Sequence, residues 1–238
     1  MLEITVTDED PERYDGVAEG RLAQEDPAEE EPAWDTMKEL TSMLRTQIAA
    51  GYADIEDLVD SADDFLDGEG EPGPGEEELG TLIGELWRER LAEQAGWEGE
   101  TDPERITRAF DVLEDAGITA REDFTCCLSC GTSEIGSEGS PGARGFVFFH
   151  SQGVEGAVET GSLSLYYGGF DGSEDTTAAI GREVAAAVAG EGLRVEWNGL
   201  PDRAVEVKLD WRKRIDPDMS ALDRDDQEDD EDDAGEEE

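Results

Sequence analysis

The side chains that could do chemistry in this protein are gathered in one short segment, DFTCCLSCGTSEIG. It holds every cysteine of the chain, at Cys126, Cys127 and Cys130, and the only histidine, His150, follows at the end of GFVFFH. Thiolate and imidazole groups bind zinc, act as nucleophiles and take part in redox reactions. Their clustering therefore predicts where a site would lie, and three interpretations of it are open.

The first interpretation is a metal site. Cys127 and Cys130 form a C-x-x-C step, to which His150 would add a third ligand and Cys126 a fourth. Zinc binds such cysteine and histidine sets with tetrahedral geometry. The chain has one C-x-x-C step and no second ligand pair, and adjacent cysteines rarely reach one ion together, so the spacing alone does not specify zinc.

The second interpretation is thiol chemistry. Cys127 and Cys130 could cycle between dithiol and disulfide, while Cys126 and His150 could act as a nucleophile and its base. A cysteine at the start of a helix or beside an imidazole has a lowered pKa, which activates it. A thiol enzyme also needs a third group that orients the histidine, and nothing in the spacing demands one.

The third interpretation is packing. Free cysteine is among the most buried residue types and behaves as a small apolar side chain. FTCCL would then be a core strand, and His150 would be satisfied by local hydrogen bonds. The clustering of all three cysteines is the observation that speaks against this interpretation.

The predicted elements place these residues at the end of two strands. FTCC leads into a short helical turn, and FVFFH leads into the next helix. If the two strands are parallel neighbours, the cysteines and His150 meet at the carboxyl edge of the sheet, where sites in α/β proteins usually lie. If the strands are antiparallel, the cysteines and His150 lie at opposite edges of the sheet and form no shared site.

The periodicity of apolar residues predicts an α+β or α/β fold. Before residue 118 the periodicity is helical, with a break at GEGEPGPG. After residue 118 strands alternate with helices and end in a hairpin, which indicates a mixed sheet layered by helices.

The acidic ends of the chain have low hydrophobicity and are predicted to be disordered. The predicted organisation is an acidic tail over 1–33, a helical region over 34–117, a mixed-sheet region over 118–214 and a second acidic tail over 215–238. Helices are expected over 34–51, 54–68, 78–97, 101–117, 151–161 and 173–192, and strands over 118–122, 124–127, 145–150, 162–170, 193–199 and 204–211.

The charge excludes several classes of partner. The 238 residues carry 65 acidic against 18 basic side chains and a formal net charge of −47. Nucleic acids and anionic membrane surfaces need a basic footprint, so neither is an expected partner. No apolar run approaches the roughly 18 residues of a membrane span. An odd number of cysteines argues against a disulfide framework, and the protein is expected in the cytoplasm with reduced thiols.

The chain also resembles a known family. GITAREDFTCCLSCGTSEIG, RGFVFFHSQGVEGAVETGSLSLYYGGF and IGREVAAAVAGEGLRVEWNG are similar to a family of uncharacterised actinobacterial proteins, the domain of unknown function 6891, over residues 34–214. Its most specific pieces are T-C-C-x-x-C-G and F-F-H-x-Q. The resemblance implies that the helical and sheet regions occur together in a bacterial cytoplasmic protein, and it implies no catalytic residue and no cofactor.

The expected function is a non-catalytic regulatory or interaction protein with an unidentified protein partner. The alternative is a thiol-dependent redox protein or a zinc protein that uses Cys126, Cys127, Cys130 and His150. Metal content and thiol reactivity would separate these possibilities.

Overall fold

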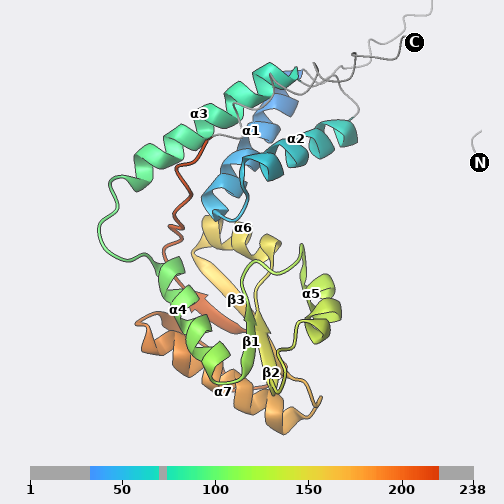
Figure 1. Cartoon of the computed structure of the whole chain (residues 1–238), viewed down its shortest axis with the longest axis vertical. Coiled ribbons are helices and arrows are strands. Elements are labelled where there is room, and N and C mark those ends of the chain that lie inside the picture. The colour runs from blue at the N-terminus through green and yellow to red at the C-terminus, as the bar shows by residue number, and fades with distance from the viewer. Residues whose placement is uncertain (1–32, 70–73, 220–238) are drawn as a thin grey trace, which may run out of the picture. The chain divides into compact units, whose positions relative to one another are not determined.

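The computed structural model describes residues 33–69 and 74–219, so the predicted acidic tails lie outside it except for residue 33 and residues 215–219. The helical half contains four helices, followed by a sheet half with five strands (Figure 1). The predicted α+β class is therefore confirmed. The helices are α1 Ala33–Ala50, α2 Ile55–Glu69, α3 Glu76–Gln94, α4 Asp102–Asp115, α5 Leu128–Glu134, α6 Ser151–Thr160 and α7 Glu174–Gly190, with a 3-10 turn, η1, at Ile135–Ser137. The strands are β1 Ile118–Arg121, β2 Gly145–Phe148, β3 Ser162–Gly169, β4 Arg194–Glu196 and β5 Val205–Lys208.

The five strands form a mixed sheet in the order β1-β2-β3-β5-β4. β1 and β2 are parallel, and every other neighbouring pair is antiparallel. The final pair, β4 and β5, is the predicted hairpin. The sheet is mixed because α5 and η1 lie in the connection from β1 to β2, which gives the chain the length it needs to return in the same direction.

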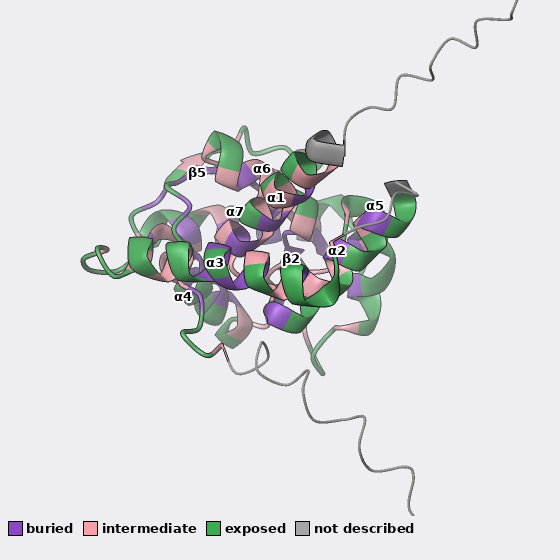
Figure 2. Ribbon diagram, turned by 90° about the horizontal axis from the view of Figure 1, so that it is seen from above, coloured by how far each residue is buried: buried purple, intermediate pink, exposed green. Residues whose placement is uncertain are grey.

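The two faces of the sheet differ in what covers them. α4 and α7 pack on one face, where they bury a continuous apolar core, and α5 lies on the other face over β1 and β2 (Figure 1). Side chains alternate between these faces, so Val147 points into the core while its neighbours Phe146 and Phe148 point towards α5. The buried positions follow the inner faces of the helices, and the exposed positions follow the outer faces (Figure 2).

Helix boundaries follow local signals that the sequence contains. Gly51 adopts a positive φ of 78° directly after α1, a conformation that commonly ends a helix at glycine. At α4, Thr101 and Glu104 form a capping box, and Pro103 sits in the first turn. Ser173 caps α7 by accepting a hydrogen bond from the Thr176 N–H. No helix within 33–69 or 74–219 is both long enough and apolar enough to cross a bilayer.

Helices α1, α2 and α3 build a second apolar core, which the far end of the chain completes. Ile215 is 5% exposed and belongs to this core, and Met219 packs against it. The indole N–H of Trp87 donates to the Asp216 carbonyl, and the Gln94 side chain both donates to and accepts from the backbone of Ile215. Residues 209–219, the C-terminal segment, therefore hold the helical half against the end of the sheet half.

One predicted strand is wrong. Residues 124–127, FTCC, form no strand, and β1 ends earlier, at Arg121. Apolar and sulfur-containing side chains gave this segment the composition of a buried strand. Its backbone instead turns through two positive φ angles, 46° at Asp123 and 61° at Thr125, which end the pairing.

Candidate functional site

The cysteines lie where the parallel pair of strands predicts them. β1 pairs with β2 in parallel from Ile118 with Gly145 to Arg121 with Phe148, so the carboxyl ends of both strands share one edge. The loop after β1 carries the cysteines, and His150 follows β2 at the same edge. Of the two arrangements left open by the sequence, the structure therefore has the parallel one, although the strand that precedes the cysteines is residues 118–121.

Backbone hydrogen bonds join the cysteine loop to the start of α6. The Ser151 N–H and hydroxyl both donate to the Thr125 carbonyl, at 3.1 and 3.0 Å, and the Gln152 N–H donates to the Cys126 carbonyl at 3.3 Å. The N–H of Phe124 donates to the carbonyl of Phe149 at 2.8 Å. The loop is thus held along its length by the segment that follows β2.

The loop is conformationally strained. Asp123 and Thr125 both have positive φ angles, a region that costs free energy for any residue with a Cβ and most for a β-branched one such as Thr125. Burial raises the pKa of the Asp123 carboxyl, and the nearby Ser151 hydroxyl and Lys213 ammonium partly offset this rise. Strained backbone persists where surrounding contacts over-determine it and is common at functional sites.

Helix α5 presents the third cysteine and depends on a glycine for its position. Cys127 is the N-cap residue of α5, and Cys130 lies in its first turn. A Cβ on Gly131 would lie 2.4 Å from Cε2 of Phe148, a side chain that is 1% exposed. Only glycine at this position lets α5 approach the sheet so closely.

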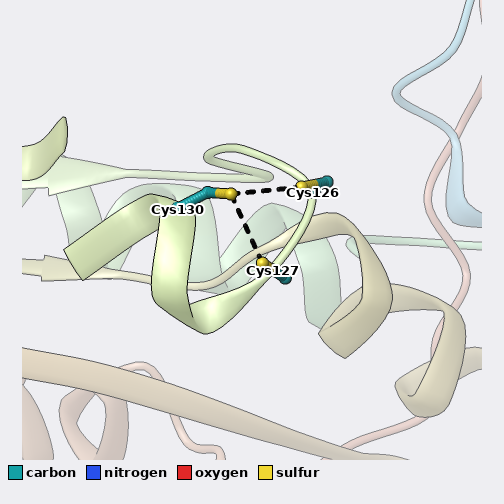
Figure 3. A group of neighbouring side chains, drawn as sticks. All are labelled: Cys126, Cys127 and Cys130. Atoms are coloured by element: carbon teal, nitrogen blue, oxygen red, sulfur yellow. Dashed lines mark hydrogen bonds between the residues drawn. The ribbon is translucent and has the colours of Figure 1, made fainter. Parts of the chain in front are cut away.

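The three sulfur atoms form one compact group, the thiol cluster of Cys126, Cys127 and Cys130 (Figure 3). The Sγ of Cys130 lies 3.5 Å from that of Cys127 and 3.6 Å from that of Cys126, and all three lie within 4.8 Å of one another. Tetrahedral zinc with bonds of about 2.3 Å needs sulfurs roughly 3.8 Å apart. Small side-chain rotations are therefore enough for all three sulfurs to bind one ion, and each is a free thiol.

The fourth predicted ligand, His150, does not belong to the thiol cluster. It is outside the group of donor atoms that lie within 4.8 Å of one another in the described residues. It is the N-cap residue of α6, where Nδ1 accepts a hydrogen bond from the Gly153 N–H at 3.1 Å, and its ring stacks on Tyr166 at 5.5 Å. The ring is 8% exposed, and burial lowers its pKa, so it is neutral at pH 7.

A comparison with known protein families matches residues 33–215 to the family described as Domain of unknown function (DUF6891). The chain belongs to this family. The searches of curated proteins and of solved structures each found no match. The matched span starts with α1 and ends at the buried Ile215, so the family unit contains the helical half, the sheet half and the start of the C-terminal segment.

In this DUF6891 member the two specific motifs meet in space. T-C-C-x-x-C-G contributes the thiol cluster and the close approach at Gly131, and F-F-H-x-Q contributes the start of α6, whose backbone pairs with the cysteine loop. The structure brings three of the four predicted ligands together. The local hydrogen bond that the packing interpretation expects of His150 is present, as its N-cap bond with Gly153. Sequence reasoning missed the stacking of His150 on Tyr166, which depends on a long-range pairing, and the positive φ angles at Asp123 and Thr125.

A second set of contacts links the cysteine loop to the helical half. The Tyr52 hydroxyl donates to the Glu122 carboxylate at 2.6 Å, and the Lys213 ammonium lies 4.2 Å from the centre of the Tyr52 ring and 3.8 Å from Glu122. Burial and the negative charge of Glu122 raise the pKa of Tyr52, so its hydroxyl keeps its proton as a donor. The start of the loop is thereby tied to the α1–α2 connection and to the C-terminal segment.

The thiols of the cluster differ in acidity. Interactions with the backbone N–H and the side chain of Cys130 lower the pKa of Cys127, and the neighbouring Cys127 and Cys126 side chains raise the pKa of Cys130 to about 12. Since the thiolate is the nucleophile and a lowered pKa increases its fraction at a given pH, Cys127 is expected to be more reactive than Cys130 at neutral pH.

Alkylation should reveal this difference. A brief pulse of iodoacetamide at pH 7, followed by peptide mass spectrometry, is expected to label Cys127 at least several-fold faster than Cys130. Cys127→Ser should remove the fast reaction, and raising the pH towards 12 should bring Cys130 closer to the rate of Cys127. Equal labelling of Cys127 and Cys130 at pH 7, or faster labelling of Cys130, would contradict the assigned acidities.

Proposed function

We propose that the protein is a non-catalytic regulatory protein that binds one thiophilic metal ion, Zn²⁺ in the first instance, through Cys126, Cys127 and Cys130. The observation that carries the proposal is the placement of three free thiols within 4.8 Å of one another. Soft thiolate ligands select soft or borderline ions such as zinc.

The position of the thiol cluster supports binding from solvent. Cys126 is exposed, and Cys127 and Cys130 are half-buried, so an ion reaches the sulfurs without opening either core. The ligands come from one segment whose backbone accepts hydrogen bonds from the start of α6. The helix in this segment, α5, packs closely against Phe148. A set of ligands held in this way loses little conformational freedom when the ion binds.

A regulatory role accords with the contacts around the loop. Binding would pull the three sulfurs together at one end of a strained loop, and the other end contacts Tyr52 through Glu122. A protein partner that contacts the helical half would then distinguish the metal-bound form from the metal-free form. The reducing environment of the cytoplasm would keep the thiols free to bind the ion.

Zinc titration of the purified full-length chain tests the proposal. One Zn²⁺ per chain is expected to bind, with protection of all three thiols from Ellman's reagent until a chelator is added. Cys126→Ser, Cys127→Ser and Cys130→Ser should each weaken binding by at least about 100-fold, beyond the roughly 10- to 100-fold effect of losing a residue that only supports a ligand. Ser129→Ala, an exposed change within α5, is the matched control and should bind as the parent does. Thiols that stay unprotected at stoichiometric zinc would refute a zinc site.

A dithiol switch is the second candidate, because Cys127 and Cys130 form a C-x-x-C step with sulfurs 3.5 Å apart. In this reaction a small-molecule disulfide oxidises the pair: the Cys127 thiolate attacks one of its sulfurs and releases one thiol. The Cys130 sulfur then displaces the second thiol and closes the Cys127–Cys130 disulfide, so two electrons and two protons pass to the oxidant. Equilibration with glutathione redox buffers distinguishes this candidate. A disulfide that forms in the metal-free protein only at strongly oxidising ratios favours the metal site.

A further inference from the structure

The number and kind of ligands in the thiol cluster point to a particular ion. We infer that the site prefers monovalent copper, Cu(I), to zinc. This inference rests on the proposed metal-binding function and specifies its ligand.

The first step is the donor set. Within the part of the chain that the structure describes, the donor atoms that lie within 4.8 Å of one another are the three sulfurs, and no imidazole or carboxylate belongs to that group. Structural zinc sites have four protein ligands in a tetrahedron, so zinc in this cluster would need a fourth ligand from solvent. Cu(I) is a softer ion that three thiolates can satisfy in a trigonal plane.

The second step concerns His150, the side chain that could complete a zinc site. Its Nδ1 is engaged by the Gly153 N–H, and its ring is stacked on Tyr166 with an angle of 17° between the planes. Recruiting the ring to the cluster would remove the cap of α6 and the stacking together. An N-cap contributes about 1 kcal/mol and an aromatic pair about 0.5–1.5 kcal/mol, and both would be lost.

The third step concerns the carboxylates near the loop. Asp123 and Glu122 are the acidic side chains in the loop itself, and neither belongs to the group of donor atoms within 4.8 Å of one another. Glu122 also accepts a hydrogen bond from Tyr52. Carboxylate oxygens are also hard ligands, which add affinity for divalent ions and little for Cu(I). The set around the ion is thus all sulfur, which favours the softer ion.

Competition under anaerobic conditions tests the inference on the full-length chain. The protein is loaded with one equivalent of Zn²⁺, and one equivalent of Cu(I) is added as its acetonitrile complex. Zinc release is followed with 4-(2-pyridylazo)resorcinol, and Cu(I) affinity is measured against bathocuproine disulfonate. Near-stoichiometric release of zinc is expected, with Cu(I) held at least about 100-fold more tightly than zinc. X-ray absorption of the copper form is expected to show sulfur as the only ligand type and a coordination number of three.

His150→Asn is the discriminating variant, since asparagine is a good N-cap and keeps α6 in place. It should leave the affinities for both ions unchanged. Zinc that stays bound against equimolar Cu(I), or zinc binding that His150→Asn weakens, would overturn the copper preference and leave the proposed metal site standing. A chain that binds neither ion overturns both proposals.

Discussion

Replacing Phe149 by alanine is expected to lower the free energy of unfolding by about 3–5 kcal/mol, the range for truncating a large buried aromatic side chain. Phe149 is fully buried between the two halves of the structure. Its ring packs against Tyr52 at 6.2 Å, Phe110 at 5.6 Å and Trp211 at 6.4 Å. The truncation therefore opens a cavity where the sheet, α4 and the C-terminal segment meet.

Urea unfolding followed by tryptophan fluorescence measures this change. Phe149→Leu retains most of the volume and should cost about 1 kcal/mol, which keeps the comparison usable if the alanine variant is already partly unfolded. Val112→Ala, at a side chain that is 53% exposed on α4, is the control and should change stability by less than about 0.5 kcal/mol. A loss below about 1.5 kcal/mol for Phe149→Ala would mean that the residue is not a central contact between these elements.

Adding one methyl group at Gly131 is the second change with a large expected effect. The new Cβ would lie 2.4 Å from Cε2 and 2.9 Å from Cζ of Phe148, whose ring is buried and packed against Phe124 and Tyr166. Gly131→Ala is expected to destabilise the protein by about 1–3 kcal/mol, the usual cost of overpacking. Because α5 must move to relieve the clash, the variant should also weaken metal binding at the cluster by about 10-fold or more, similar to losing a supporting residue.

Gly136→Ala provides the matched control, since a Cβ there meets nothing within 4 Å. This change should leave metal binding unchanged and should keep or slightly raise stability, because alanine has less conformational freedom to lose than glycine. Urea unfolding and metal titration of the two variants side by side give the readout. If Gly131→Ala behaved like Gly136→Ala in both measurements, the close packing of α5 on Phe148 would be wrong.

The features that could be predicted from the sequence are those fixed by local signals. The helical spacing of apolar residues predicts the helices themselves. Gly51 marks the end of α1, and the capping box at Thr101 marks the start of α4. Each of these signals lies within a few residues of the helix end that it determines. The hairpin of β4 and β5 and the cap at Ser173 were predictable for the same reason. The parallel pairing of β1 and β2 could be stated only as a condition, because strand direction depends on how the whole chain packs.

The site was predictable in its composition and less so in its geometry. Cysteine spacing alone indicated the thiol cluster. The prediction of a strand at residues 124–127 failed because tertiary hydrogen bonds from Phe124 to Phe149, and from α6 to Thr125 and Cys126, hold this segment in a conformation that local propensity disfavours. The stacking of His150 on Tyr166 depends on the pairing of β2 with β3, which local spacing does not reveal.

The hydrogen bonds between α3 and the C-terminal segment affect the order in which the chain folds during synthesis. The bonding partners of Gln94 and Trp87 lie 121 and 129 residues further along the sequence. A nascent chain that has emerged from the ribosome through α4 therefore carries the first three helices without the groups that complete their packing. Contacts of such high sequence separation form slowly, so the helices α1, α2 and α3 are expected to reach their final packing only after the sheet and the C-terminal segment have been translated.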